Sequence, residues 1–390
     1  MGHTGETTDE EIYGQIDSLI LEESAREYLS LAGKRKLRRE LFNSIRRLDL
    51  LQELVDDDTV TEIMVNGTDG IFLERNGRIA RWEKKIDSRE KLEDLVQQIA
   101  GRCNRIVNES VPIADARLEN GARVNLVLYP VALNGPVITI RRFPSNPVGM
   151  RQLIAWDSIT EEAAGFLEIL VKAGYNIFIS GGTGSGKTTF LNALSDFIPK
   201  DERIITIEDN AELQIQGVAN LVKLEARRGN TEGENEITIR DLIKSSLRMR
   251  PDRIIVGEVR GEEALDMLQA LNTGHDGSLS TGHGNSPKDM LSRLETMVLM
   301  GLELPLPAIR RQIASGVDIM VHLGRMRDKT RKVLEILEVT GYDVPTGEIE
   351  THLLYEFRET GSGEEKVCGK LQKTGELLHT QKIERAGLAL

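Results

Sequence analysis

Cysteine is scarce in this sequence of 390 residues. Its two cysteines, Cys103 and Cys368, are too few for a disulfide framework or a four-cysteine zinc site. Aromatic residues make up 4% of the chain, and 62 Asp plus Glu outnumber 50 Lys plus Arg, which leaves a net charge of −12. A reducing cytoplasm is therefore the simplest location, and the excess of acids argues against a protein that coats nucleic acid.

Long apolar runs are also missing. The best apolar stretch, residues 124–133, contains Asn125 and Pro130 and is far shorter than the ~20 residues of a transmembrane helix. The N-terminus opens with acidic residues, where a secretion signal would need a basic start followed by an apolar run. We therefore expect neither a membrane span nor an export signal.

Charge is segregated near the N-terminus. Residues 1–33 carry eight acids and one arginine, whereas residues 34–47 carry seven basic residues and one acid. Leucine and isoleucine recur at helical spacing inside the basic block, so we expect an amphipathic helix with a cationic face within a helical extension, residues 1–55. A solvated helix face is the simpler interpretation, and docking onto an acidic partner or anionic lipid head groups is the alternative.

The remaining length fits about two domains at roughly 150 residues each. Strand-like runs separated by Asn-Gly turns, followed by a helix with a capping box at Asp87 and Glu90, predict a small α/β domain over residues 56–143. A turn-rich linker follows at residues 144–149.

Apolar strands alternate with helices in the second domain, residues 150–358. A capped helix is expected over residues 158–172, and buried strands at residues 176–180, 204–207 and 253–256 predict a parallel sheet covered on both faces. Three later runs are expected to add antiparallel strands at its edge: residues 318–323, 332–339 and 352–357. The polar, glycine-rich residues 359–390 predict a loosely held tail.

The most informative segment is residues 181–188, which match the phosphate-loop pattern. Glycines there let backbone N–H groups turn toward phosphate oxygens. Lys187 would reach the β- and γ-phosphates, and the Thr188 hydroxyl would ligate Mg²⁺. An apolar strand before the loop and a helix after it support the match. With ATP and Mg²⁺ as ligands, the assigned nucleotide-binding residues are Gly181, Gly182, Thr183, Gly184, Ser185, Gly186, Lys187, Thr188 and Thr189.

Carboxylates follow two of the predicted strands. Glu258 ends an apolar strand, the position that places an acid beside Mg²⁺ at the carboxyl edge of a parallel sheet, although an ordinary surface glutamate is the alternative. Glu208, Asp209 and Glu212 follow another strand, and three acids in five residues repel one another unless a cation or a reaction uses them. One of these three could orient or deprotonate the attacking water.

Two histidines, His275 and His283, lie in a segment of small residues that must pass near the nucleotide. Helix caps and a strand edge would explain the glycines of this segment without any chemistry. The eight-residue spacing without a third ligand is not typical of zinc. The histidines are therefore candidates for a nucleotide-linked role or for a purely structural one.

Together these residues resemble the type II/IV secretion ATPase superfamily. Residues 208–212 resemble its Asp box, Gly257-Glu258 the end of its Walker B strand, and His275 with His283 its His box. Three further segments look like the Tad/CpaF pilus-assembly branch: residues 60–67, 116–125 and 273–278. The resemblance covers about residues 40–358. It implies a RecA-like P-loop NTPase domain behind a smaller, PAS-like α/β domain and an N-terminal helical extension.

The function implied by the resemblance is that of a hexameric motor. Such a ring hydrolyses ATP at subunit interfaces to power assembly of a Tad/Flp (type IV-like) pilus or a type II/IV secretion system. The implied partners are further copies of the chain and inner-membrane platform proteins, without nucleic acid. The implied location is cytoplasmic, peripheral at the cytoplasmic face of the membrane. The sequence does not distinguish extension, retraction and export.

The resemblance also implies a role for each candidate residue. Glu212 would activate water with support from Glu208 and Asp209, Glu258 and Thr188 would hold Mg²⁺, and His275 and His283 would couple the nucleotide to the ring. The arginines of the N-terminal domain would neutralise charge on the transferred phosphoryl group across an interface, although surface ion pairs are the alternative. These arginines are Arg117, Arg123 and Arg141, with Arg142 less certain.

One feature departs from the family pattern, because Gly282 and Gly284 flank the second histidine where much of the family has bulkier residues. We expect these glycines to loosen the loop. Two other functions are kept as alternatives. A nucleic-acid translocase shares the phosphate loop and strand order, but the net charge of −12 and the few aromatics disfavour it. A nucleotide-gated scaffold would bind ATP without turning it over.

Overall fold

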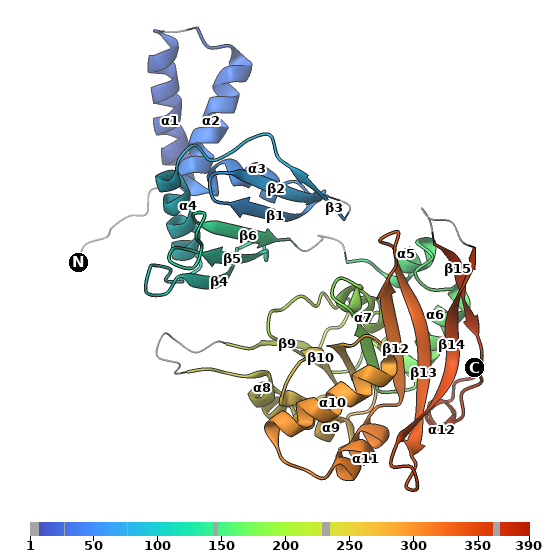
Figure 1. Ribbon diagram of the computed structural model, residues 1–390. Coiled ribbons are helices and arrows are strands. Elements are labelled where there is room, and N and C mark those ends of the chain that lie inside the picture. The colour runs from blue at the N-terminus through green and yellow to red at the C-terminus, as the bar shows by residue number, and fades with distance from the viewer. Residues whose placement is uncertain (1–7, 27, 76, 143–146, 228–234, 362–366) are drawn as a thin grey trace. The chain divides into compact units, whose positions relative to one another are not determined.

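The computed structural model describes residues 8–26, 28–75, 77–142, 147–227, 235–361 and 367–390. They form two compact units, Met1–Ser145 and Asn146–Leu390, each described here by itself (Figure 1). The division falls inside the expected linker at residues 144–149, of which residues 144–146 lie outside the described residues. None of the helices in the described part of the chain is long and apolar enough to cross a bilayer.

The first unit begins with a helical hairpin, α1 (Asp9–Ser24) and α2 (Leu31–Arg46), which confirms the helix predicted for the basic block. Ile12, Ile16, Ile20 and Phe42 form its small core. The hairpin also buries the ring of Tyr13 against Phe42, with the ring centroids 4.0 Å apart.

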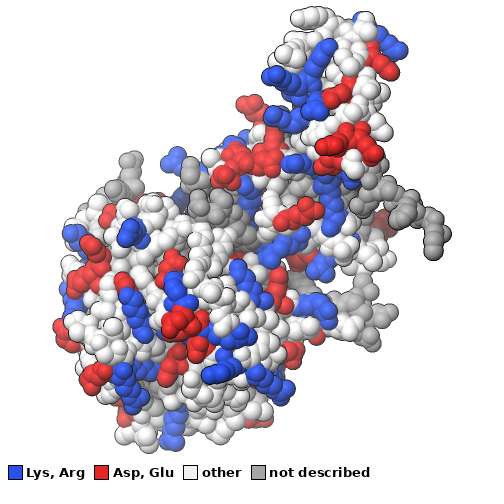
Figure 2. Space-filling model, turned by 180° about the vertical axis from the view of Figure 1, so that it is seen from behind, with Lys and Arg blue, Asp and Glu red and all other residues white. Residues whose placement is uncertain are grey.

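The basic block pairs with the acidic block of the same chain. Arg38 Nε lies 2.6 Å from Asp17 Oδ1, and Arg46 Nε lies 3.6 Å from Asp9 Oδ1. The Arg38 guanidinium also lies over the Tyr13 ring, 4.2 Å from its centroid. Figure 2 shows basic and acidic side chains beside one another on this hairpin. Part of the cationic face therefore already has an acidic partner within the chain.

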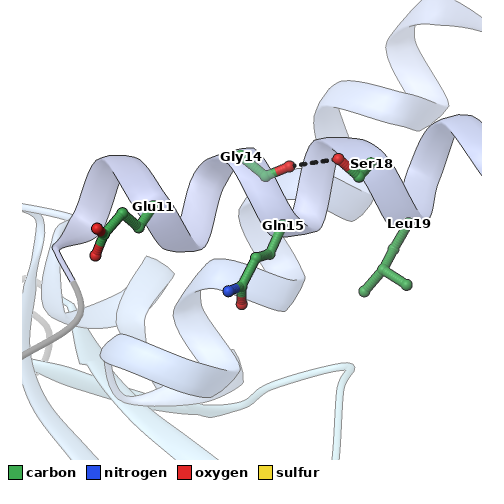
Figure 3. A pocket seen from close by; sticks show the side chains of 5 residues that line it. All are labelled: Glu11, Gly14, Gln15, Ser18 and Leu19. Atoms are coloured by element: carbon green, nitrogen blue, oxygen red, sulfur yellow. Dashed lines mark hydrogen bonds between the residues drawn. The ribbon is translucent and has the colours of Figure 1, made fainter.

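One face of α1 carries a surface pocket of about 770 Å³ (Figure 3). Its lining residues follow a single helix face: Glu11, Gly14, Gln15, Ser18 and Leu19. The Ser18 hydroxyl donates to the Gly14 carbonyl at 2.9 Å, and Glu11 accepts the Thr8 backbone N–H as part of a capping box. The groups of this face serve the helix itself, so we do not treat the pocket as a functional site.

A six-stranded antiparallel sheet forms the rest of the first unit, in the order β3-β2-β1-β6-β5-β4. The strands of this sheet are β1 (Val60–Asn66), β2 (Gly70–Arg75), β3 (Arg78–Arg81), β4 (Ile113–Arg117), β5 (Arg123–Val127) and β6 (Val137–Arg141). The helices of this part of the unit are η1 (Asp49–Leu51), α3 (Gln52–Val55) and α4 (Arg89–Arg102). The β1–β2 hairpin turns at Gly67, whose φ of +58° suits glycine. Ser88 caps α4 by accepting the Lys91 N–H, so the capping box predicted at Asp87 is wrong by one residue.

A nine-stranded sheet organises the second unit, in the order β15-β14-β13-β12-β7-β11-β10-β8-β9. Its strands are β7 (Ile177–Gly181), β8 (Ile204–Glu208), β9 (Leu221–Glu225), β10 (Arg253–Val259), β11 (Leu279–His283), β12 (Ile319–Arg325), β13 (Arg331–Tyr342), β14 (Ile349–Gly361) and β15 (Cys368–Lys373). Its helices are α5 (Met150–Ala155), α6 (Glu161–Lys172), α7 (Lys187–Ser195), α8 (Ile239–Ser246), α9 (Glu263–Leu271), α10 (Pro287–Gly301), α11 (Leu306–Gly316) and α12 (Gln381–Arg385).

The sheet is covered on both faces, as predicted. Side chains alternate between the faces of a strand, and Ile177 and Ile179 of β7 pack in one core cluster while Phe178 packs in another. The first cluster includes residues of α6 and α7, and the second includes residues of α8 to α11. Central strands β12, β7, β11, β10, β8 and β9 run parallel, which brings their carboxyl ends to one edge.

Three expectations about this unit are wrong. Residues 319–325 form a strand parallel to β7 rather than an antiparallel addition, whereas β13 and β14 are antiparallel as expected. Thr160, not Ser158, caps α6. The described residues after 358 are not a loosely held tail, because β14 continues to Gly361 and β15 pairs with it. Residues 362–366 of the predicted tail lie outside the described residues. Within this segment Val367, Leu371, Leu377 and Ile383 are buried.

Candidate functional site

The phosphate loop lies between the central strand β7 and helix α7. Gly184 and Gly186 have φ of +72° and +94°, a region that glycine enters at little cost. A Cβ on Gly181 would lie 2.5 Å from the Leu323 carbonyl oxygen and 2.5 Å from Ser185 Oγ, so the close approach of β12 also requires glycine. The loop therefore takes backbone conformations that favour glycine where the motif has it. Thr188 and Thr189 follow it, half-buried in the first turn of α7.

Lys187 extends back across the loop. Its side chain is buried, and its Nζ donates to the carbonyls of Gly181 and Gly182, each at 3.1 Å. The same nitrogen lies 3.3 Å from His283 Nδ1. Burial lowers the pKa of Lys187, and the nearby Glu258 carboxylate opposes that shift. The ammonium group is thus held at the mouth of the loop by groups that an incoming phosphate can replace.

His283 connects Lys187 with Glu258. It is the last residue of β11, directly opposite Gly181 in the register with β7, and its Nε2 lies 2.9 Å from Glu258 Oε1. Burial lowers the pKa of His283, Lys187 lowers it further, and Glu258 raises it. A neutral ring presents Nδ1 as an acceptor to the ammonium and Nε2–H to the carboxylate. The predicted acid, histidine and lysine therefore converge at one edge of the sheet.

Glu208 is the most perturbed acid of the site. It ends β8 with its side chain buried, and burial raises its pKa to about 7. Its Oε1 accepts the backbone N–H groups of Glu212 at 2.9 Å and Leu213 at 3.0 Å, whereas its Oε2 is buried without a hydrogen-bond partner among the described residues. A Cβ on Gly257 would lie 2.7 Å from Glu208 Cγ. Glycine in β10 therefore makes room for this carboxyl, which fixes the turn that carries Glu212.

Arg260 joins the two groups of acids, although the sequence did not single it out. Its Nη2 lies 3.1 Å from Asp209 Oδ2, and its Nε lies 3.3 Å from Glu258 Oε2. Asp209 is exposed and Glu212 is half-buried at this edge. The only signal in the sequence is that Arg260 follows Glu258 by two residues.

The residues present fit ATP and Mg²⁺. Two loop glycines have positive φ, and Ser185 Oγ is buried without a hydrogen-bond partner among the described residues. In the same residues no three His, Cys, Asp or Glu side chains converge as a metal cage. Mg²⁺ at a phosphate loop needs no such cage, because it keeps several waters and binds substrate phosphates. Thr188 and Glu258 are the protein groups suited to it.

His275 does not join this group within one chain. It lies four residues before the first residue of β11, whereas His283 is the last residue of that strand. His275 Nδ1 lies 3.3 Å from the Ala270 carbonyl oxygen. The expected loop is wrong here because residues 279–283 form a central strand. Its neighbour Asp276 pairs with Lys382 at 2.8 Å.

The glycines beside His283 pack tightly rather than loosening the segment. A Cβ on Gly282 would lie 2.9 Å from Phe178 Cζ and 3.0 Å from the end of Met290. A Cβ on Gly284 would lie 3.0 Å from Met290 Cβ. The absence of side chains lets α10 approach β11, so the expectation of a looser loop is wrong.

The three predicted arginines of the first unit form a row. Arg117 in β4 lies opposite Arg123 in β5, and Arg123 lies opposite Arg141 in β6. Residues directly opposite one another share a face of the sheet. Arg142 is instead bound to the chain itself: its guanidinium donates to the carbonyls of Asp57 and Val60 and contacts Asp58. The structure thus groups Arg117, Arg123 and Arg141 and separates Arg142 from them.

Two further residues beside the phosphate loop carry no recognisable signal in the sequence. His322 of β12 is buried, with its Nδ1 2.9 Å from the hydroxyl of Ser180, the residue before Gly181. Arg331, the first residue of β13, donates from Nε to the Gly184 carbonyl at 2.9 Å. No local motif marks either one, because each reaches the loop through the pairing of strands distant in sequence.

Comparison with known proteins places these features in a family. Residues 46–373 match the family model described as type II/IV secretion system protein. A Mycobacterium tuberculosis protein provisionally named as a conjugal transfer protein is 35% identical over 312 residues, which cover 78% of this chain and 87% of the relative. The conjugal transfer protein TrbB of Rhizobium radiobacter is 34% identical, and the match covers 75% of this chain and 88% of the relative. The type IV secretion system protein PtlH of Bordetella pertussis is 32% identical, and the match covers 76% of this chain and 96% of the relative.

Solved structures show the same fold. The ATPase DotB of Legionella pneumophila has a TM-score of 0.54 at 21% identity, covering 74% of this chain and 79% of its own. The pilus retraction motor PilT, solved with bound ADP, has a TM-score of 0.55 at 18% identity. This match covers 87% of this chain and 86% of the PilT chain. The larger unit therefore has the RecA-like fold expected from the sequence, accompanied by a smaller α/β unit and N-terminal helices.

Proposed function

Because the chain belongs to the type II/IV secretion system protein family, we propose that it is a motor that hydrolyses ATP at its phosphate loop. The observation that carries the proposal is the convergence of Lys187, His283, Glu258 and Glu208 at one edge of the parallel sheet. Phosphoryl transfer asks a protein mainly for positioning and electrostatic stabilisation, and these groups supply both.

Each residue has a defined task in this proposal. The loop N–H groups and Lys187 bind the phosphates, with Lys187 exchanging its carbonyl bonds for phosphate oxygens. Bound Mg²⁺ would neutralise phosphate charge, held by the Thr188 hydroxyl and by Glu258. Glu212 accepts the proton of the attacking water. Glu208 positions Glu212 by holding the backbone of its turn.

The arginine row supports a ring of subunits. Arg117, Arg123 and Arg141 lie on one face of the smaller unit, and a guanidinium delivered across an interface would neutralise charge on the phosphoryl group of a neighbouring subunit. We propose that the ring is a hexamer, as the resemblance to the secretion ATPase superfamily implies. His275 precedes β11 and His283 ends it, so this strand would couple the nucleotide to the ring.

We propose a Tad/Flp pilus or a type II/IV secretion system as the machine that this motor powers. Support comes from the Tad/CpaF-like segments at residues 60–67, 116–125 and 273–278 and from relatives named for conjugal transfer and type IV secretion. The partners would be inner-membrane platform proteins at the cytoplasmic face. The net charge of −12, with acidic and basic side chains intermingled on the face in Figure 2, disfavours nucleic acid as the substrate.

The decisive experiment is steady-state phosphate release from the purified full chain with MgATP. We expect turnover by the wild type and its loss in Lys187→Ala and Glu212→Gln. The matched controls are Lys172→Ala and Glu168→Gln on α6, an exposed i,i+4 pair away from the loop. Undiminished turnover in Glu212→Gln would remove that residue from its role.

Two other outcomes would replace the motor. ATP binding without phosphate release in the wild type would favour a nucleotide-gated scaffold. Strong stimulation of turnover by single-stranded DNA would favour a nucleic-acid translocase.

A further inference from the structure

Two arginines face each other on the hairpin beside the phosphate loop. Arg325, the last residue of β12, and Arg331, the first residue of β13, are directly opposite in the antiparallel register. Both side chains are exposed. Like charges directly opposite one another on neighbouring strands destabilise a sheet, so this pairing needs a compensating group.

Both arginines lie against loop glycines. Arg331 Nε donates to the Gly184 carbonyl at 2.9 Å, and its Cδ lies 3.2 Å from the position that a Cβ on Gly186 would take. Arg325 Nη1 lies 3.6 Å from the position of a Cβ on Gly184. The two arginine side chains thus lie beside Gly184 and Gly186 of the phosphate loop.

A carboxylate does not compensate this pair among the described residues. Neither Arg325 nor Arg331 forms an ion pair there, whereas the third arginine of the hairpin, Arg327, binds both carboxylate oxygens of Glu359. The same hairpin therefore holds one arginine with an acidic partner and two that lie beside an anion-binding loop.

We propose that Arg325 and Arg331 form a guanidinium pair that binds the phosphate oxygens of the nucleotide held by the phosphate loop of the same subunit. The inference rests on the proposed nucleotide-binding function and adds two phosphate ligands to it. Guanidinium groups suit this role because their planar array of N–H donors matches phosphate geometry. The pair differs from Arg117, Arg123 and Arg141, which belong to the smaller unit.

The test is direct binding of ADP to the full chain, measured by calorimetry without turnover. We expect Arg325→Gln and Arg331→Gln each to weaken ADP binding about tenfold, the cost of one charge-assisted hydrogen bond. Arg325→Lys should retain part of the affinity. Arg327→Gln is the matched control, since it removes an arginine of the same hairpin, and it should bind ADP as the wild type does.

A second measurement separates ligand binding from a structural role. Arg325→Gln removes one of two facing like charges, so the nucleotide-free variant should unfold at a temperature no lower than the wild type. Wild-type affinity in both glutamine variants, or equal weakening in Arg327→Gln, would overturn the inference. If the wild type binds ADP but releases no phosphate from ATP, the motor proposal fails, while a weakened Arg325→Gln still supports the pair.

Discussion

Replacing Glu208 by Gln tests whether a buried carboxyl really ends β8. Glutamine keeps the oxygen that accepts the backbone N–H groups of Glu212 and Leu213 but carries no charge at any pH. The substitution therefore separates the charge of residue 208 from its hydrogen bonds. Glu212 raises the pKa of Glu208 and Lys223 lowers it, but burial is the largest cause of the shift.

The expected magnitude follows from the pKa. A rise from the ordinary value of 4.5 to about 7 corresponds to about 3 kcal/mol, at about 1.36 kcal/mol per pKa unit. Because the folded-state pKa is the higher one, ionisation of Glu208 costs nothing below pH 4.5. The cost grows as pH rises and is complete above about pH 7. The wild type should thus lose up to about 3 kcal/mol of stability over this window, and the variant should not.

Thermal unfolding at pH 5 and pH 8 measures this difference. For a unit of this size about 1 kcal/mol shifts the midpoint by roughly 2–4 °C, so the gap between variant and wild type should change by up to about 6–12 °C. An unpaired amide in the variant adds an offset that is the same at both pH values. Glu168→Gln on the surface of α6 controls for the loss of a charge. An equal gap at pH 5 and pH 8 would refute the burial of an ionisable group.

Three other predictions concern packing, assembly and the C-terminal segment. Gly257→Ala should lower the free energy of unfolding by about 1–3 kcal/mol and impair phosphate release, because its Cβ would lie 2.7 Å from Glu208 Cγ. Gly165→Ala, with open space around its Cβ, should do neither. Mixing Arg123→Ala with Lys187→Ala proteins should restore part of the phosphate release through mixed interfaces, and no recovery from proteins that form rings would count against action in trans. Deleting residues 367–390 should lower the free energy of unfolding by several kcal/mol, measured by chemical denaturation. Burial contributes about 1.5–3 kcal/mol for each of Val367, Leu371, Leu377 and Ile383. Unchanged stability would show that this segment does not belong to the core.

Much of the fold could be predicted because its signals are local. An apolar strand, a glycine-rich turn and a helix follow one another in residues 177–195, and the structure contains all three. The strand over residues 279–283 gave no such signal, because its middle residues, Ser280, Thr281 and Gly282, are small and form no apolar run. In the sheet their polar groups are satisfied across strands: Thr281 Oγ1 donates to the Gly257 carbonyl at 2.7 Å. A buried strand can therefore look like a loop when its neighbours supply its hydrogen bonds.

The sequence of the C-terminal segment hides its structure for a related reason. Its buried apolar residues are spaced four to six apart, between charged and glycine residues, and match neither strand nor helix periodicity. Polar groups anchor the segment as well. Glu338 accepts the backbone N–H groups of Leu378 and His379, and Lys382 pairs with Asp318 at 2.7 Å. Contacts of this kind join residues far apart in the chain, so no window of sequence contains them.

Contacts between residues far apart in the chain also limit what the sequence predicts about the candidate site. Lys187 was a candidate from the phosphate-loop motif, Glu258 from its place at the end of an apolar strand, and His283 from its small-residue segment and the family resemblance. Arg331 was not, because 147 residues separate it from the Gly184 carbonyl that it binds. Strand order decides which residues meet at this edge, and strand order is a property of the whole sheet.

The arginine row has a mechanical consequence. Because Arg117, Arg123 and Arg141 are mounted on three neighbouring strands about 4.8 Å apart, they span about 10 Å of one hydrogen-bonded surface. Backbone pairing prevents one of these strands from advancing without the others. The three backbone positions that carry these arginines must therefore move together. Replacing one arginine of the row leaves the other two in place. Phosphate release should therefore fall in steps as the three arginines are replaced one after another.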